Sequence, residues 1–152
     1  MNFIRGILVG GDTEPFQLSR QGLGLLLLRI LFGLGIMLHG VDTMMREGGM
    51  EGMAKSVEGL GFPAPTFFAY CAKLSEIVGG AFVMIGLFTR PACLFLIITM
   101  GVAAFLAKAD ASLKDRELPL MYLVLFVVIF ITGPGKFAVD TVLRAIWKAK
   151  TL

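Results

Sequence analysis

The run from Pro91 to Ala107 most constrains how this chain can fold, because it contains no charged residue. Further apolar segments before and after it give predicted membrane spans at about 22–39, 66–88, 91–107 and 118–132. A helix needs about 20 mostly apolar residues to cross the hydrocarbon core of a bilayer. We therefore expect an all-α fold in which residues 1–152 form a single membrane domain, a bundle of four transmembrane helices.

The composition agrees with a membrane protein and argues against other classes. Hydrophobic residues make up 57% of the chain, whereas soluble domains contain about 45–50%. The formal net charge is +3, but most basic residues flank apolar segments, where they would meet lipid headgroups and not nucleic acid. The two cysteines, Cys71 and Cys93, form no CxxC pair and lie inside predicted spans. We expect them to be buried free thiols, and not a disulfide or a dithiol redox site.

The segment from about Val41 to Pro65 predicts a cap between the first two spans. It is polar overall, yet apolar residues recur in it at roughly helical spacing, at Met44, Met50, Met53, Val57 and Leu60. This pattern is typical of a short amphipathic helix, which we expect to lie over one mouth of the bundle. Residues 1–20 lack a signal-peptide cleavage pattern and predict an interfacial turn or short helix. The basic tail, 136–152, predicts a helix on the cytoplasmic surface.

The distribution of Lys and Arg predicts the orientation. Basic residues are somewhat more frequent on the side of the N-terminus and of the tail than on the side of the 41–65 segment. Because cytoplasmic loops carry an excess of Lys and Arg, we expect both termini in the cytoplasm. An even number of spans agrees with that orientation.

Charged residues interrupt two of the predicted spans, at Arg29, Lys73 and Glu76. A charge at mid-membrane costs about 2.5–3.5 kcal/mol on insertion scales, so such residues face the bundle interior and usually have partners. Lys73 and Glu76 share one helix face. Depths counted at about 1.5 Å per residue allow Arg29 to pair with Glu76 across antiparallel neighbours. His39 should lie near the outer end of the first span, within range of Lys73, and Glu117 begins the fourth span on that side.

Arg29, His39, Lys73, Glu76 and Glu117 therefore form a candidate polar pocket, for which two interpretations stay open. In the first, an Arg–Glu pair only locks two helices together. In the second, the pocket opens to the outer mouth and binds a quinone head group or a small anion. No catalytic residue is assigned. A single histidine cannot supply a bis-histidine haem and metal-binding residues do not cluster, so neither haem nor a metal is expected.

Several short motifs resemble the DoxX family of small bacterial membrane proteins. They are Leu28-Arg29-Ile30 with Leu38-His39-Gly40; Leu60-Gly61-Phe62-Pro63-Ala64-Pro65; Glu76 with Gly79-Gly80 and Gly86-Leu87-Phe88-Thr89-Arg90; Glu117-Leu118-Pro119-Leu120; and Gly133-Pro134-Gly135-Lys136 followed by Asp140. The order and spacing of these motifs, from about Leu25 to Leu143, make the resemblance specific. One departure is Val41-Asp42-Thr43-Met44, a stretch in which such proteins often carry a lysine.

The resemblance implies a four-helix bundle in the bacterial cytoplasmic (inner) membrane. It also implies a link to quinone-dependent sulfur oxidation, since the family name comes from a subunit of a thiosulfate:quinone oxidoreductase. Our leading hypothesis is a subunit of a membrane redox system, with a protein partner, in which the polar pocket binds quinone and Glu76 or His39 passes protons. One alternative is a non-catalytic assembly or scaffold protein that recruits a partner enzyme through the 41–64 cap or the basic tail. Another is a small-molecule transporter, which would have to form a homo-oligomer.

Overall fold

The computed structural model describes residues 14–150, and every regular element in this range is helical, which confirms the all-α prediction. The elements in chain order are α2 (Glu14–Met45), α3 (Gly49–Gly59), α4 (Pro65–Leu74), η1 (Ser75–Gly79), α5 (Gly80–Ile85), α6 (Thr89–Gly101), η2 (Val102–Ala107), α7 (Leu113–Thr132) and α8 (Val139–Lys150). The two η elements are π-helical turns that continue the helices on either side of them. An interfacial turn or short helix was predicted for residues 1–20. Residues 1–13 lie outside the described part of the chain, and residues 14–20 form the start of α2.

Three helical segments are long and apolar enough to cross a membrane, namely Gly22–Met45, Pro65–Ile85 and Thr89–Ala107. They confirm the first three predicted spans. The fourth predicted span, 118–132, is the apolar part of α7. The first turn of α7 carries Lys114, Asp115, Arg116 and Glu117. With these charges, α7 is not among the helices that are long and apolar enough to be identified as spans. A fourth crossing stays a prediction.

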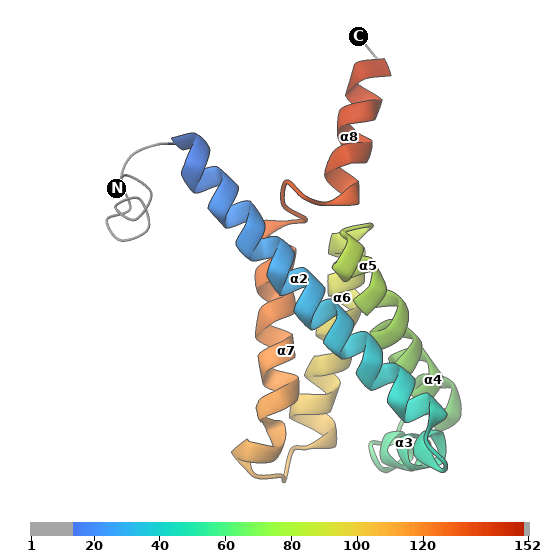
Figure 1. Ribbon diagram of the computed structural model, residues 1–152. Helices are drawn as coiled ribbons and strands as arrows, with labels where there is room; N and C mark the ends of the chain where they lie inside the picture. The colour runs from blue at the N-terminus through green and yellow to red at the C-terminus, as the bar shows by residue number, and fades with distance from the viewer. Residues whose placement is uncertain (1–13, 151–152) are drawn as a thin grey trace.

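The spans pack as an antiparallel bundle (Figure 1). Helix α2 crosses the bundle and packs along η1 and α5, while α6 packs against α7. Backbones approach closely where glycines meet: a Cβ at Gly33 would lie 2.7 Å from the carbonyl oxygen of Gly80. Small residues allow this approach between helices in lipid. The core between the helices is apolar and includes Ile36, Val83, Leu96 and Phe126.

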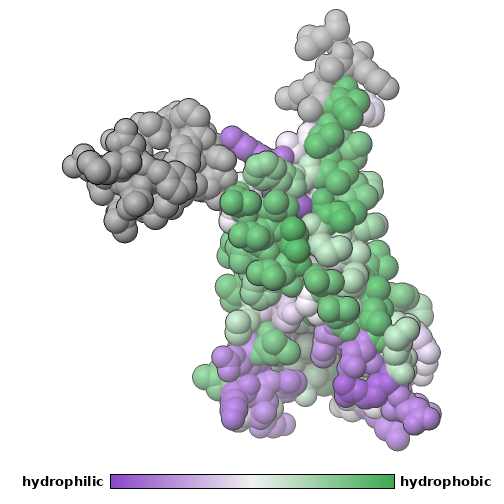
Figure 2. All heavy atoms as spheres, viewed as in Figure 1, coloured by the Kyte–Doolittle hydropathy of each residue, from purple (hydrophilic) through white to green (hydrophobic). Residues whose placement is uncertain are grey.

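The surface of the bundle is divided by polarity (Figure 2). The trunk is largely hydrophobic, while hydrophilic residues gather at the end that carries α3 and the α6–α7 connection. We call this the cap end. The opposite end carries the turn at 86–88 and the connection from α7 to α8, and we call it the tail end. The first turns of α2 and all of α8 lie at the tail end, while the placement of the termini in the cytoplasm stays a prediction.

Two predicted helix boundaries were wrong. The first helix was expected to end at His39, before Gly40, but α2 continues to Met45. Gly40 is a packing residue and not a terminator, because a Cβ there would lie 2.8 Å from Cγ1 of Ile77 and 3.3 Å from the carbonyl oxygen of Lys73. Helix α2 also begins before the predicted span, which starts at about residue 22, because the helix already includes Glu14.

The expected loop 108–117 is helical from Leu113 onward, and Pro119 lies inside α7 instead of at its start. Proline has no N–H, so the carbonyl four residues earlier loses its helical partner. That carbonyl belongs to Asp115, and the ammonium of Lys108 donates to it at 2.6 Å. This side-chain bond replaces the missing one and lets the helix begin before the proline.

The remaining segments agree with the predictions in part. The cap prediction is confirmed by α3, which packs against α4 and buries Val57. Gly133, with φ of 81°, ends α7, and α8 follows in the tail as a helix. Both cysteines are free, but only Cys93 is buried, whereas Cys71 is exposed on α4.

Candidate functional site

Lys73 and Glu76 form a buried ion pair inside the second span. The ammonium of Lys73 donates to both carboxylate oxygens of Glu76, at 2.9 and 2.8 Å. The residues are only 4% and 2% exposed. Because they lie three residues apart, they share a face of the same helix, as the sequence predicts. Each charge thus has its partner within one helical turn, and this pairing offsets part of the free-energy cost of burying the two charges in the membrane.

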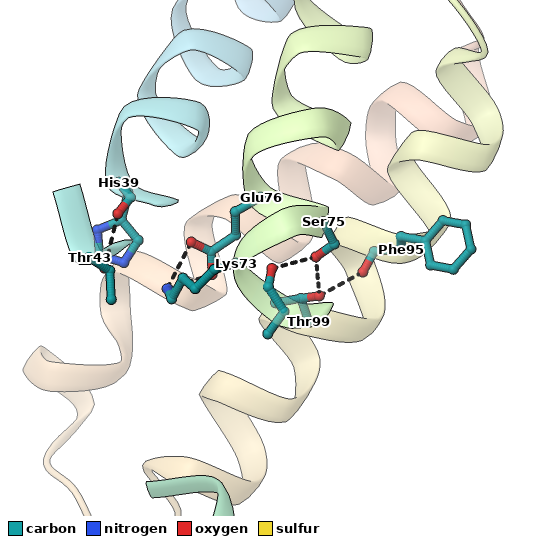
Figure 3. A network of polar contacts seen from close by, with 8 residues as sticks. His39, Thr43, Lys73, Ser75, Glu76, Phe95 and Thr99 are labelled. Carbon is teal, nitrogen blue, oxygen red and sulfur yellow. Dashed lines mark hydrogen bonds and ion pairs between the residues drawn. The ribbon is translucent and has the colours of Figure 1, made fainter. Parts of the chain in front are cut away.

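The π-helical turn η1 begins between these two residues, at Ser75 (Figure 3). Ser75 Oγ lies 2.8 Å from Thr99 Oγ1 on α6, and the two hydroxyls share a hydrogen bond. The Ser75 hydroxyl is also within hydrogen-bond distance of the carbonyl oxygen of Ala72, at 2.7 Å, and the Thr99 hydroxyl of that of Phe95, at 3.0 Å. This network fixes the turn against α6. Single π-turns inside α-helices occur often at functional sites.

His39 lies on the α2 side of the ion pair (Figure 3). Its neighbour Gly40 brings the two helices together, since a Cβ at Gly40 would lie 3.1 Å from Cβ of Glu76. His39 is exposed and lies within electrostatic range of Glu76. The structure therefore brings His39, Lys73 and Glu76 together at the cap end, as predicted.

A cavity of about 110 Å³ lies beside this group. It is lined by Ile36, His39, Met100, Lys108, Leu118, Pro119 and Tyr122. Tyr122 lies within electrostatic range of Glu76, and its hydroxyl rests on Gly35, where a Cβ would lie 2.5 Å from the oxygen. Among the side chains that the structure describes, none forms a hydrogen bond with the Tyr122 hydroxyl or the His39 ring.

Sequence reasoning missed Tyr122. The chain has two tyrosines, and a tyrosine within an otherwise apolar helix is a weak signal that was available. The sequence does not reveal that Tyr122 packs against Gly35, and this contact places the hydroxyl at the cavity.

Arg29 does not belong to this group, and its predicted pairing with Glu76 was wrong. It is 1% exposed and donates to backbone carbonyls at the tail end: Nε to Val83 at 3.0 Å, Nη2 to Met84 at 3.3 Å, Nη1 to Pro134, and both Nη1 and Nη2 to Phe137 at 3.4 Å. Glu76 instead lies opposite Gly40. The length of α2 from Arg29 to Gly40 is roughly 16 Å at 1.5 Å per residue, too far for a pair.

The surroundings of Arg29 explain why an arginine is there. The last carbonyls of a helix have no partner within that helix, and a cation near them is favourable. The guanidinium has five N–H donors, and it donates to carbonyl oxygens at the end of α5 and in the α7–α8 connection. Arg29 therefore has a structural role, but with carbonyl partners in place of the predicted carboxylate.

Asp140 completes this tail-end junction. Its carboxylate accepts hydrogen bonds from the backbone N–H of Phe88 at 2.9 Å, and from the N–H and hydroxyl of Thr89 at 3.0 Å each. Its own N–H donates to the carbonyl oxygen of Gly86 at 2.9 Å. The start of α6 and the start of α8 are thus joined to the end of α5.

Glu117 is also separate from the buried pair. It is exposed on α7 and lines a larger groove of about 840 Å³ between α7 and Phe32 of α2. The residues that line this groove are Phe32, Leu113, Lys114, Glu117, Leu120, Met121, Val124, Leu125 and Val128. The predicted pocket is therefore divided among three places: the buried pair with His39, the tail-end junction and the groove.

Comparison with known proteins places these residues in a family context. Residues 24–109 match the DoxX family model, a range that includes Arg29, His39, Lys73 and Glu76. A Bacillus subtilis (strain 168) protein named "Putative oxidoreductase CatD" is 29% identical over 119 residues, which cover 78% of this chain and 85% of that protein. No solved structure was found to match the chain.

Two further relatives are named as membrane proteins. The inner membrane protein YphA of Escherichia coli (strain K12) is 30% identical over 125 residues, covering 76% of this chain and 87% of its own. The uncharacterized membrane protein Rv3486 of Mycobacterium tuberculosis (strain ATCC 25618 / H37Rv) is 30% identical over 131 residues, covering 74% of this chain and 77% of its own.

Proposed function

Because this chain belongs to the DoxX family of membrane proteins, we propose that it is a subunit of a membrane redox system and binds a quinone head group beside Lys73 and Glu76. The observation that carries the proposal is the cavity at the cap end. Two polar side chains, those of His39 and Tyr122, line it, and neither the His39 ring nor the Tyr122 hydroxyl has a hydrogen-bond partner among the described side chains. The name of the Bacillus subtilis relative, an oxidoreductase, agrees with a redox role.

The residues at the cavity fit a quinone ring. A quinone ring is flat and neutral and has two carbonyl oxygens, which accept hydrogen bonds. The Tyr122 hydroxyl and an N–H of His39 are donors of the required kind. The cavity volume of about 110 Å³ is well above the roughly 10–15 Å³ that one water needs, so it has room for part of a small ligand.

The charges at the site favour a neutral head group over a small anion. Lys73 is already neutralised by Glu76, and Arg29 is bound to carbonyls at the tail end. Lys108, which lines the cavity, donates to the carbonyl of Asp115. This neutral carbonyl leaves the ammonium charge of Lys108 in place, so a small anion would depend on Lys108 as its counter-ion, whereas a neutral quinone needs only the hydrogen-bond donors of His39 and Tyr122.

The side chains at the site can also handle protons. A bound quinone would supply the redox chemistry, which couples electron uptake to proton uptake. His39 is exposed at the cap end, and a neutral imidazole has one N–H donor and one acceptor nitrogen, so its ring can both give and take a proton. Glu76, held by Lys73, lies within electrostatic range of both His39 and Tyr122. We propose that Glu76 or His39 passes protons to the bound head group.

Extraction and binding test this proposal. The full chain is purified in mild detergent from a quinone-containing membrane, and co-extracted quinone is measured by mass spectrometry. We expect bound quinone, and a thermal stabilisation on adding decylubiquinone. Repeated absence of both would contradict the function.

An assembly role is a second candidate, which α8 favours. This helix projects from the tail end of the bundle (Figure 1). It exposes apolar side chains at helical spacing, namely Val139, Val142, Leu143 and Ile146. Such a face is suited to binding a partner protein. Co-purification of one specific enzyme that is lost in Leu143→Asp, with quinone binding unchanged, would support this role.

A further inference from the structure

The groove between α2 and α7 is apolar along most of its length. Charged side chains lie only near its cap end, at Lys114 and Glu117, while Leu120, Val124 and Val128 continue it along one face of α7. The groove exists because α2 leans on η1 and α5 and contacts α7 over a short stretch only. Its volume of about 840 Å³ is open to the side of the bundle.

An aromatic contact joins the lining of this groove to the lining of the polar cavity. The rings of Phe32 and Tyr122 meet edge to face, with centroids 5.7 Å apart and planes at 85°. Phe32 lines the groove, and Tyr122 lines the cavity that contains His39. The apolar groove and the polar cavity therefore adjoin along α7, where Met121 lines the groove and Tyr122 lines the cavity, and the two rings form part of their shared boundary.

We propose that this groove holds the isoprenoid tail of the quinone whose head group lies in the cavity. This inference rests on the proposed function. Membrane quinones join a small polar ring to one long hydrocarbon chain, and the two sites have these two characters and share the Phe32–Tyr122 wall. A phospholipid fits less well, because it has two hydrocarbon chains, whereas Leu120, Val124 and Val128 give one apolar stripe along α7; the cation that a phosphate would meet in this groove is Lys114, at its cap end.

A binding experiment with two quinones tests the tail site. The probes are decylubiquinone and its tail-less parent, dimethoxymethylbenzoquinone, each titrated into the purified full chain. The variant Val124→Phe adds bulk inside the groove. The control is Ile131→Phe on the same helix, an exposed position that does not line the groove.

We expect the unaltered protein to bind decylubiquinone more tightly than the tail-less quinone, since burying hydrocarbon is favourable. Val124→Phe should weaken decylubiquinone binding by about tenfold or more and leave the tail-less quinone within about twofold, while Ile131→Phe changes neither. The tail site is overturned if the chain adds no affinity, or if Val124→Phe has no effect or weakens both quinones equally. The proposed function then stands. If the unaltered protein binds neither quinone, the proposed function fails and the tail site fails with it.

Discussion

Gly86 lies directly against the guanidinium of Arg29: a Cβ at Gly86 would lie 2.4 Å from Nη2. Gly86 also has φ of 75°, a conformation that other residues adopt at a cost. These two facts make the end of α5 a junction in which a glycine leaves room for an arginine. The arginine in turn binds the carbonyls that the helix end exposes.

Gly86→Ala should therefore destabilise the protein. The left-handed backbone alone costs roughly 1–2 kcal/mol for an alanine, and displacement of Arg29 adds the cost of unsatisfied carbonyls. We expect a lower apparent melting temperature in detergent. The matched control is Gly24→Ala on α2, where a Cβ would meet nothing within 4 Å. Equal melting temperatures for the two variants would show that the junction is not tight.

Arg29→Lys separates a structural role from a binding role. Lysine has three donors in place of five, so buried carbonyls at the tail end lose partners, at about 1–3 kcal/mol for each group. We expect a marked loss of thermal stability, with unchanged quinone affinity in the protein that remains folded. A stable variant that no longer binds quinone would return Arg29 to the functional site.

Asp140→Ala should loosen the joint between α6 and α8. The carboxylate accepts from the first N–H groups of α6, and the loss of such a cap costs about 0.5–2 kcal/mol. The measurement is the apparent melting temperature, with Asp110→Ala as the control, because Asp110 is exposed in the α6–α7 connection. The account would be contradicted if the control lowered the melting temperature as much as Asp140→Ala.

A double-mutant cycle on Lys73 and Glu76 measures their coupling. Removing one partner of a buried pair costs about 3–5 kcal/mol, while replacing both can be nearly neutral. We therefore expect Lys73→Met and Glu76→Leu each to destabilise strongly, and the double variant Lys73→Met/Glu76→Leu to regain much of the stability. The double variant should bind quinone weakly, because the carboxylate of Glu76, which lies within electrostatic range of His39 and Tyr122, is gone.

The control for that cycle is the exposed pair of Asp42 and Arg46, whose side chains are 58% and 69% exposed. Surface pairs contribute only about 0–1 kcal/mol, so changes there should be small. Equal changes in stability at the buried pair and at the surface pair would contradict the claim that burial makes the Lys73–Glu76 pair important for stability.

Hydropathy and helical spacing were sufficient to predict three spans, the cap helix and the shared helix face of Lys73 and Glu76, but the predicted partner of Glu76 was Arg29 and not Lys73. Long apolar runs leave few alternatives in a bilayer, and residues three apart on a helix share a face. The partners of Arg29 could not be predicted in this way. Backbone carbonyls are present at every position, so their use as acceptors leaves no mark in the sequence.

Gly40 and Tyr122 were missed for a similar reason. A glycine at a packing contact looks like a glycine at a helix end until the neighbouring helix is placed against it. Tyr122 faces the cavity because Gly35 on α2 makes room for its hydroxyl, a relationship between residues far apart in the sequence. Contacts of this kind depend on helix register, which hydropathy does not determine.

The most direct test of the proposed function is quinone binding by Tyr122→Phe. This change removes only the hydroxyl and keeps the ring that packs against Phe32 and Phe126, so the melting temperature should stay close to that of the unaltered protein. The control is Tyr70→Phe, the other tyrosine, which is exposed on α4. We predict that Tyr122→Phe weakens binding of the tail-less quinone by about tenfold, as the loss of one hydrogen bond would, while Tyr70→Phe has no effect. Unchanged binding in both variants would contradict a head-group site at this cavity.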